Sequence, residues 1–333
     1  MNTTDFVKYG GVLIALAICS ACGDGSAVAP SNAALNAGYI GRTFSVNGRL
    51  VTAAHPNLSA LPRYATIVPD RHAKSKYFEY IINDYGTYAS IFDYPKSDQQ
   101  IGKITNVGGQ GCTNVLYGYG KKTFWIVAGR DQITEYKVPK KALKTLSVPS
   151  GQPSSCAMDT SGDLAVGNLA NGEVVIFPHA SGSGTVMTTP LSEEYFDGYD
   201  NNGNLFADGF GNSGFDLVEL PKGSGTFEKI TTSNTVEFPG SVQWDGTYLT
   251  VTDQEANEMY QYTVSGTKAT LKGTVSLSGS VDCAQTWIAT GVVFCADAGD
   301  YGAEVFNYPA GGSPIATFTG NFDLPLGAVA AEK

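Results

Sequence analysis

From residue 77 onward, the chain repeats a short stretch of alternating apolar and polar residues that ends at a proline. The spacings between successive ends are 44, 39, 43, 43 and 45 residues when Val264, in a proline-free copy, is counted as one of them. Alternation with a period of two is typical of β-strands, and a repeat of this length is typical of a propeller blade. The sequence therefore predicts six units. The prolines that end the stretches are Pro95, Pro139, Pro178, Pro221 and Pro309.

Each unit contains further strands around the Pro-terminated one. Turns rich in Asp, Asn and Gly at residues 159–163, 200–204 and 244–248 precede a second alternating stretch, and another strand follows the proline. Asp, Asn and Gly favour such turns because they tolerate positive φ and form local side-chain hydrogen bonds. Four strands in each repeat match one propeller blade. The predicted fold is an all-β, six-bladed β-propeller of four-stranded antiparallel blades.

The two ends of the repeat region complement each other. The C-terminal segment 324–330 resembles segments 153–158 and 239–243, which are predicted innermost strands. The first unit, which begins near residue 77, has no such segment of its own. We therefore expect the C-terminal strand to pair with the first unit and close the ring, which removes an exposed sheet edge.

Residues 1–22 have the pattern of a lipoprotein-type signal peptide. Lys8 precedes an apolar stretch at 10–18, which is shorter than the roughly 20 residues that a membrane-spanning helix needs. Small residues lead to Cys22, the predicted lipidated N-terminus, although Cys19 stands where Leu is usual in a lipoprotein box. An ordinary cleaved secretory signal is the alternative. Both interpretations predict export to the periplasm or cell surface, the first as an outer-membrane lipoprotein.

The rest of the chain divides into a linker and a folded domain. Residues 23–60 are predicted to be a flexible tether, and residues 61–333 the six-bladed β-propeller. A formal charge of −10 and a pI near 4.8 argue against nucleic acid as a partner. We expect a monomer that contacts the membrane through its N-terminal lipid only.

Four cysteines remain besides Cys19 and Cys22, and they allow three disulfide connectivities. Cys112 and Cys156 occupy equivalent places in the innermost strands of consecutive units, whereas Cys283 and Cys295 flank one predicted hairpin. These positions favour disulfides 112–156 and 283–295. A zinc site is the alternative, but the spacing typical of zinc ligands is absent.

The sequence shows no catalytic constellation. The three histidines are His55 in the tether, His72, and His179, which is interpreted as an exposed turn residue. Acidic groups at 193–204 and 253–257 offer oxygen ligands for a structural or central-channel calcium ion. Turn geometry explains these residues as well, so no cofactor, metal ligand or catalytic residue is assigned. Trp125, Trp244 and Trp287 are interpreted mainly as packing between blades.

Segments 198–208, 219–224, 238–246 and 307–314 resemble a group of uncharacterised bacterial exported propeller proteins. That group is similar to the NHL-like and gluconolactonase-like six-bladed propellers, and the resemblance covers residues from about 77 to 330. It implies the fold rather than the function. Gluconolactonase-type enzymes hold a divalent metal in the central channel, but their ligands have no residue-by-residue match in this chain.

Two functions follow as hypotheses. The first is a non-enzymatic binding or scaffolding module that holds a protein, peptide or glycan on one propeller face. The alternative is a metal-dependent, lactonase-like hydrolase or lyase that uses the central channel. The sequence identifies neither the ligand nor the functional face.

Overall fold

The computed structural model describes residues 43–46, 49–52, 77–83, 87–128, 131–149 and 151–333. The chain separates into two units, residues 1–61 and residues 62–333. In the first unit, β1 (Thr43–Val46) and β2 (Arg49–Thr52) form an antiparallel hairpin within the predicted tether. The predicted signal peptide, Cys22 and the remainder of the tether lie outside the described residues. The part of the chain that is described contains no helix long and apolar enough to cross a membrane.

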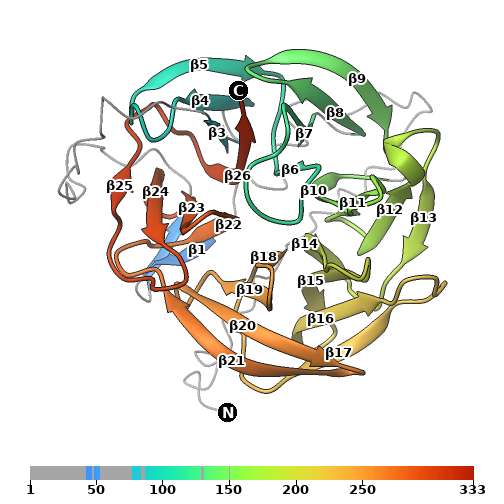
Figure 1. The fold of residues 1–333 in the computed structure, drawn as a ribbon. Helices are drawn as coiled ribbons and strands as arrows, with labels where there is room; N and C mark the ends of the chain where they lie inside the picture. Colours follow the sequence, from blue (N-terminus) through green and yellow to red (C-terminus); the bar gives the residue numbers. More distant parts are fainter. Residues whose placement is uncertain (1–42, 47–48, 53–76, 84–86, 129–130, 150) are drawn as a thin grey trace, which may run out of the picture. The chain divides into compact units, whose positions relative to one another are not determined.

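The second unit is a ring of β-sheets (Figure 1). Four of its sheets are four-stranded and antiparallel, and their strands follow one another from the centre of the ring to its rim. In that order they are β26 (Pro325–Glu332), β3 (Tyr77–Asn83), β4 (Tyr88–Phe92) and β5 (Gln100–Thr105); β6 (Gly111–Thr113), β7 (Thr123–Val127), β8 (Gln132–Lys137) and β9 (Lys141–Ser147); β10 (Pro153–Met158), β11 (Leu164–Asn168), β12 (Glu173–Phe177) and β13 (Thr185–Thr188); and β22 (Cys283–Ala289), β23 (Val292–Asp297), β24 (Gly302–Asn307) and β25 (Ala316–Thr317).

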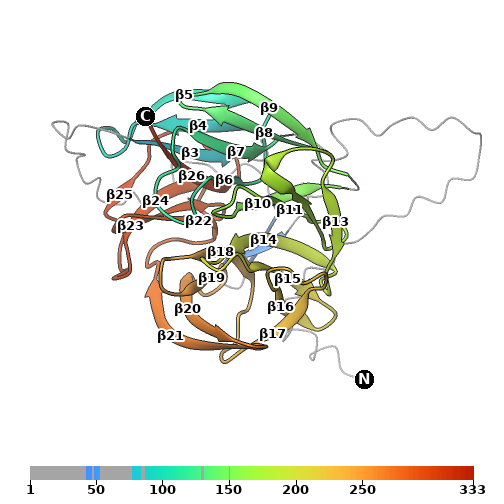
Figure 2. The same ribbon diagram turned by 45° about the vertical axis from the view of Figure 1, so that its right-hand side comes forward.

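The fifth sheet is eight-stranded and consists of two antiparallel groups of four. They are β14 (Glu193–Tyr199), β15 (Leu205–Gly211), β16 (Gly214–Leu220) and β17 (Glu228–Thr232); and β18 (Pro239–Trp244), β19 (Leu249–Asp253), β20 (Glu258–Ser265) and β21 (Lys268–Ser276). The outer strands β17 and β21 join the groups at the rim by a short parallel pairing at Thr231 and Thr232 (Figure 2). The predicted all-β, propeller-like arrangement of four-stranded antiparallel sheets is therefore confirmed.

The Pro-terminated stretch that revealed the repeat has one place in every group of four strands. It forms the third strand from the centre, and these strands are β4, β8, β12, β16, β20 and β24. The innermost strands contact one another in a closed series, from β26 through β6, β10, β14, β18 and β22 back to β26. The regular repeat thus places one innermost strand of each group beside the centre of the ring.

The C-terminal strand closes the ring, as the sequence predicts. β26 pairs antiparallel with β3 along its length, so that Val329 lies opposite Tyr80 and Glu332 opposite Tyr77. Most residues of β26 are buried, including Val329 and Ala330 with no exposed surface. The first sheet therefore takes its innermost strand from the opposite end of the chain.

A hydrogen bond from the backbone to an Asn or Asp side chain recurs where the chain crosses from one sheet to the next. In three sheets, an Asn or Asp at the end of the second strand accepts from the backbone N–H two residues before an innermost strand. The pairs are Asn83 with Asp323 at 2.9 Å, Asp253 with Glu237 at 2.8 Å and Asp297 with Val281 at 2.7 Å. These bonds satisfy backbone donors that no strand pairs with.

Both predicted disulfides are present. Cys112 and Cys156, 44 residues apart, join the innermost strands β6 and β10 of neighbouring sheets. Cys283 and Cys295, 12 residues apart, join the two strands of the β22–β23 hairpin. The first bridge links two sheets, whereas the second stays within one.

Candidate functional site at the centre of the ring

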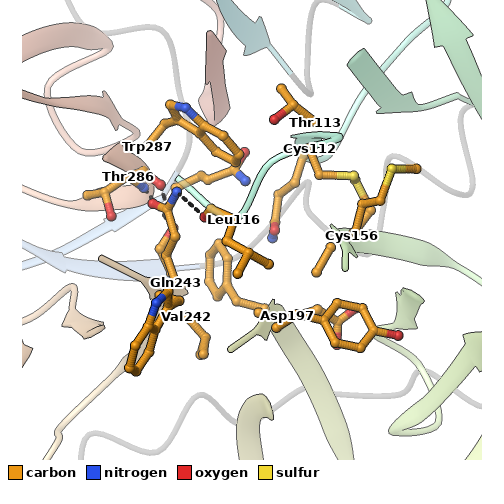
Figure 3. Close-up of a pocket in the computed structure, with 18 of the residues that line it drawn as sticks. Cys112, Thr113, Leu116, Cys156, Asp197, Val242, Gln243, Thr286 and Trp287 are labelled. Carbon is orange, nitrogen blue, oxygen red and sulfur yellow. Dashed lines mark hydrogen bonds between the residues drawn. A yellow bond between two sulfur atoms is a disulfide. The ribbon is translucent and has the colours of Figure 1, made fainter. Parts of the chain in front are cut away.

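A small cavity lies at the centre of the ring (Figure 3). Its walls come from the innermost strands β6, β10, β14, β18 and β22 and from the connection that follows β6. Among the lining residues are Asp197, Gln243 and Gln285. The free volume is about 30 Å³, enough for roughly two water molecules.

Two glutamine side chains, one from the innermost strand β22 and one from the residue before β6, bridge the centre of the ring. The Gln285 amide oxygen accepts from the backbone N–H groups of Gly111, at 3.1 Å, and Ala328, at 2.8 Å, and its nitrogen donates to the Gly111 carbonyl. Gln110 donates to the carbonyl of Tyr195 at 2.8 Å. These bonds link strands on different sheets across the centre, so the amide groups are already paired with backbone.

Residues 114–120, in the connection between β6 and β7, reach across the centre; we call this segment the β6–β7 plug. The side chain of Trp287 donates to the Gly118 carbonyl at 2.7 Å, and the Gly118 N–H donates to the Ile288 carbonyl at 2.8 Å. Gln243 donates to the Leu116 carbonyl at 3.0 Å, and these two residues lie side by side in Figure 3. The plug therefore ties its own sheet to strands β18 and β22 while it forms part of the cavity wall.

The plug also packs against side chains of two neighbouring sheets and against a turn across the ring. Leu116 contacts an apolar cluster that includes Ala157 of β10 and Tyr199 of β14. Tyr117 lies against Gly246 in the β18–β19 turn, where a Cβ atom would stand 2.9 Å from the tyrosine ring. Gly246 also has a φ of +101°, so glycine is the residue that fits this turn on both counts.

Two carboxyl groups lie at the contact between β10 and β14, and one of them, Asp197, lines the cavity. The Ser155 hydroxyl oxygen lies 2.8 Å from Oε1 of Glu194 and 3.0 Å from Oδ2 of Asp197. A bulge in β14 between Glu194 and Phe196 brings both acidic side chains to the same serine, because regular alternation would send them to opposite faces. Gly167 leaves the space for Glu194, since a Cβ there would lie 1.8 Å from Oε2.

Burial changes the charge state of this pair. It raises the pKa of Asp197 to about 7, with the hydrogen bond from Ser155 opposing the rise. It raises the pKa of Glu194 well above its ordinary value, and the neighbouring charge of Asp197 adds to that shift. Two close carboxyl groups in a dry site retain a proton at neutral pH. The pair is therefore equipped to hold or transfer a proton.

Two of the glutamine oxygens at the centre are engaged by the backbone. Calcium takes six to eight oxygen ligands, and the amides of Gln243 and Gln285 are bonded to backbone groups through both oxygen and nitrogen. Across the described residues, one group of three candidate ligand atoms lies within 4.8 Å of one another, formed by Cys295, Asp297 and Glu304. The Cys295 sulfur in that group belongs to a disulfide.

The acidic residues of segment 193–204, which the sequence offered as calcium ligands, have two different roles in the structure. Asp200 accepts from the backbone N–H groups of Asn202 and Asn204 at 2.8 and 2.9 Å, and Asp159 bonds to residues 161 and 163 in the same way. This confirms the interpretation of the segment as a turn. Glu194 and Asp197, from the same acidic segment, point instead to Ser155.

The remaining predicted residues have ordinary surroundings. The His179 side chain is 79% exposed, as expected for a turn residue. His55 and His72 lie outside the described residues. Trp125 and Trp287 are buried in apolar clusters, so packing is confirmed as their role.

The sequence analysis did not identify the bridging glutamines. The signal in the sequence was a glutamine near or within three innermost-strand segments, at positions 110, 243 and 285.

Comparison with known proteins supports the fold. No protein-family model and no curated protein matches the chain. A protein of unknown function from Bacteroides caccae has a similar structure, with a TM-score of 0.59 and 11% identity over 78% of this chain and 100% of that one. A chain of a nidogen/laminin complex has a TM-score of 0.59 and 9% identity over 77% and 98%. A functionally unknown protein from Desulfotomaculum acetoxidans DSM 771 has a TM-score of 0.51 and 11% identity over 77% and 88%.

Proposed function

We propose that this chain is an exported, monomeric, six-bladed β-propeller, anchored by a lipid on Cys22, that acts as a non-enzymatic binding or scaffolding module. In this proposal the eight-stranded sheet counts as two blades that touch at the rim. The closed series of innermost strands and the six repeats support that count. The partner is a protein, peptide or glycan held on an outer surface of the propeller, in the periplasm or at the cell surface.

The narrow, largely filled centre of the ring carries the argument for binding rather than catalysis. The cavity of about 30 Å³ is far smaller than the several hundred Å³ typical of small-molecule sites. The β6–β7 plug and the glutamine bridges fill the remaining space with groups that are already hydrogen-bonded. A partner therefore has to bind outside the centre.

Export is supported by the cysteines. Both disulfides join buried strands, and disulfides persist in oxidising compartments outside the cytoplasm. Cells that express the full chain with a labelled fatty acid test the anchor. We expect label on the wild-type protein and none on Cys22→Ser, whereas unlabelled wild-type protein in the culture medium would indicate a simply secreted chain.

A metal-dependent, lactonase-like hydrolase or lyase is the second candidate, and the carboxyl pair favours it. Asp197 lines the cavity, and it and the neighbouring Glu194 retain a proton at neutral pH, which suits general acid–base chemistry. Metal analysis of the purified full chain, combined with a lactone hydrolysis screen with and without a chelator, separates the two functions. We expect no stoichiometric metal and no chelator-sensitive turnover. Turnover that a chelator abolishes, and that Asp197→Asn also removes, would overturn the binding proposal.

A further inference from the structure

Five lysines gather at one end of the sheet formed by β6–β9; we call them the lysine cluster. All five lysines are exposed. They lie directly before β7, at the end of β8, in the turn that follows it and at the start of β9. The strand register places Lys137 opposite both Thr123 and Lys141, and the backbone N–H of Val138 donates to the Lys122 carbonyl. The cluster is Lys121, Lys122, Lys137, Lys140 and Lys141.

The cluster contrasts with the charge of the chain as a whole. Residues 111–147 contain six lysines and one arginine against two acidic residues, while the chain carries a formal charge of −10. Within the described residues, the lysines that form ion pairs are Lys144, Lys229 and Lys333, and none of them belongs to the cluster. Uncompensated lysines on an acidic protein concentrate positive potential on one small surface.

The cluster lies at the end of the ring where the chain enters its first strand from the N-terminal side. Gly120, the neighbour of Lys121, bonds through its N–H to the Ala330 carbonyl and through its carbonyl to the Glu332 N–H. Glu332 in turn pairs with Tyr77, the first residue of β3, whose ring stacks on Tyr119 at 3.5 Å between centroids. Tyr77, where the described part of the propeller begins, therefore lies at the same end as the cluster.

We propose that the lysine cluster docks the propeller onto an anionic phospholipid membrane, an inference that rests on the proposed export and lipid anchor and replaces the expectation of membrane contact through the lipid only. Lysine ammonium groups act as mobile point charges that suit a disordered array of phosphates. Each lysine near an anionic surface favours binding by about fivefold at moderate salt. A lipid chain combined with a polybasic surface holds a protein to a membrane more firmly than either one alone. The docked propeller presents its opposite end to the binding partner.

Vesicle flotation of the mature chain carrying Cys22→Ser tests the cluster without any contribution from the lipid. The probes are vesicles of phosphatidylglycerol mixed with phosphatidylcholine, and vesicles of phosphatidylcholine alone. The test variant combines Lys121→Gln, Lys122→Gln, Lys140→Gln and Lys141→Gln. The matched control combines Lys96→Gln, Lys222→Gln, Lys268→Gln and Lys272→Gln, all exposed lysines on other sheets.

We expect the protein to bind the anionic vesicles only. The affinity for these vesicles should fall at least tenfold in the test variant and change by less than twofold in the control. Binding weakens as salt rises, because counterions screen exposed charges. Equal losses in both variants, or no binding to anionic vesicles, would overturn the proposal. Capture by an immobilised acidic polysaccharide without vesicle binding would overturn it in favour of a glycan. Because the protein carries no lipid here, failure of the anchor appears separately, in the fatty-acid labelling of Cys22.

Discussion

Two contacts between neighbouring sheets show how differently the same architecture is held together. Between the β26–β5 sheet and the β6–β9 sheet, Tyr80, Phe124 and Tyr136 stack with ring centroids 4.0 and 5.6 Å apart. We call this contact the aromatic seam. Between the β10–β13 sheet and β14, the contact combines an apolar cluster with a polar group formed by Ser155 and the buried carboxyl groups of Glu194 and Asp197; we call this polar group the acidic seam.

The stability of the aromatic seam depends on packing, whereas the stability of the acidic seam depends on protonation. The aromatic seam buries apolar surface, whose contribution changes little with pH. The acidic seam is stable while its carboxyl groups retain protons, because a buried charge without a partner is costly. The ring closes beside the aromatic seam, whereas the acidic seam borders the central cavity. The following changes test this division, beginning with the largest expected effect.

Removal of residues 325–333 eliminates β26 and opens the first sheet. The loss exposes β3 and the buried faces of Tyr80 and Ile82, so we expect an unfolded or aggregated protein. Circular dichroism and size-exclusion chromatography measure the outcome. Deletion of Lys333 alone is the control and should leave the melting profile near that of the wild type. A chain without β26 that melts normally would contradict ring closure.

Phe124→Ala removes the central ring of the aromatic seam. Phe124 is fully buried, so the substitution should lower the free energy of unfolding by about 3–5 kcal/mol. Tyr80→Phe is the matched control: it keeps the stacked ring and removes only the hydroxyl that donates to the Pro139 carbonyl, at a cost of about 1 kcal/mol. Urea unfolding measures both. If both variants lowered the free energy of unfolding equally, the stacked rings would not stabilise this seam as described.

Raising the pH should weaken the acidic seam and leave the aromatic seam unchanged. The folded pKa of Asp197 is about 7 against an ordinary value of 3.8, so the folded state binds more protons between these pH values. The free energy of unfolding therefore falls as pH rises through this window and levels off above it. We expect a Tm lower by on the order of 5 °C at pH 8 than at pH 5.

Asp197→Asn sharpens that comparison because it removes the titrating group. The variant should show a smaller decrease in Tm between pH 5 and pH 8, while Asp131→Asn, at an exposed position, keeps the wild-type slope. A Tm that rises with pH in the wild type would mean that the carboxyl groups are charged and paired in the folded state.

The repeat made the architecture predictable, while the centre of the ring was harder to predict. Proline spacing, turn chemistry and the resemblance of 324–330 to other innermost segments led to the sheets, the ring closure and both disulfides. The acidic seam depends on a bulge at Glu194, which no alternating pattern specifies. The plug depends on hydrogen bonds from Gln243 to Leu116 and from Trp287 to Gly118, which join residues distant in sequence.

The central proposal is that the narrow centre of the ring serves the structure rather than a metal-dependent reaction. The most direct test is calcium titration into the chelator-treated full chain, followed by thermal unfolding, because a ligand that binds the folded state raises Tm with concentration. We predict a Tm that stays constant up to the millimolar concentrations at which weak extracellular calcium sites fill. A Tm that rises with calcium in the wild type and stays constant in Asp197→Asn would contradict the account.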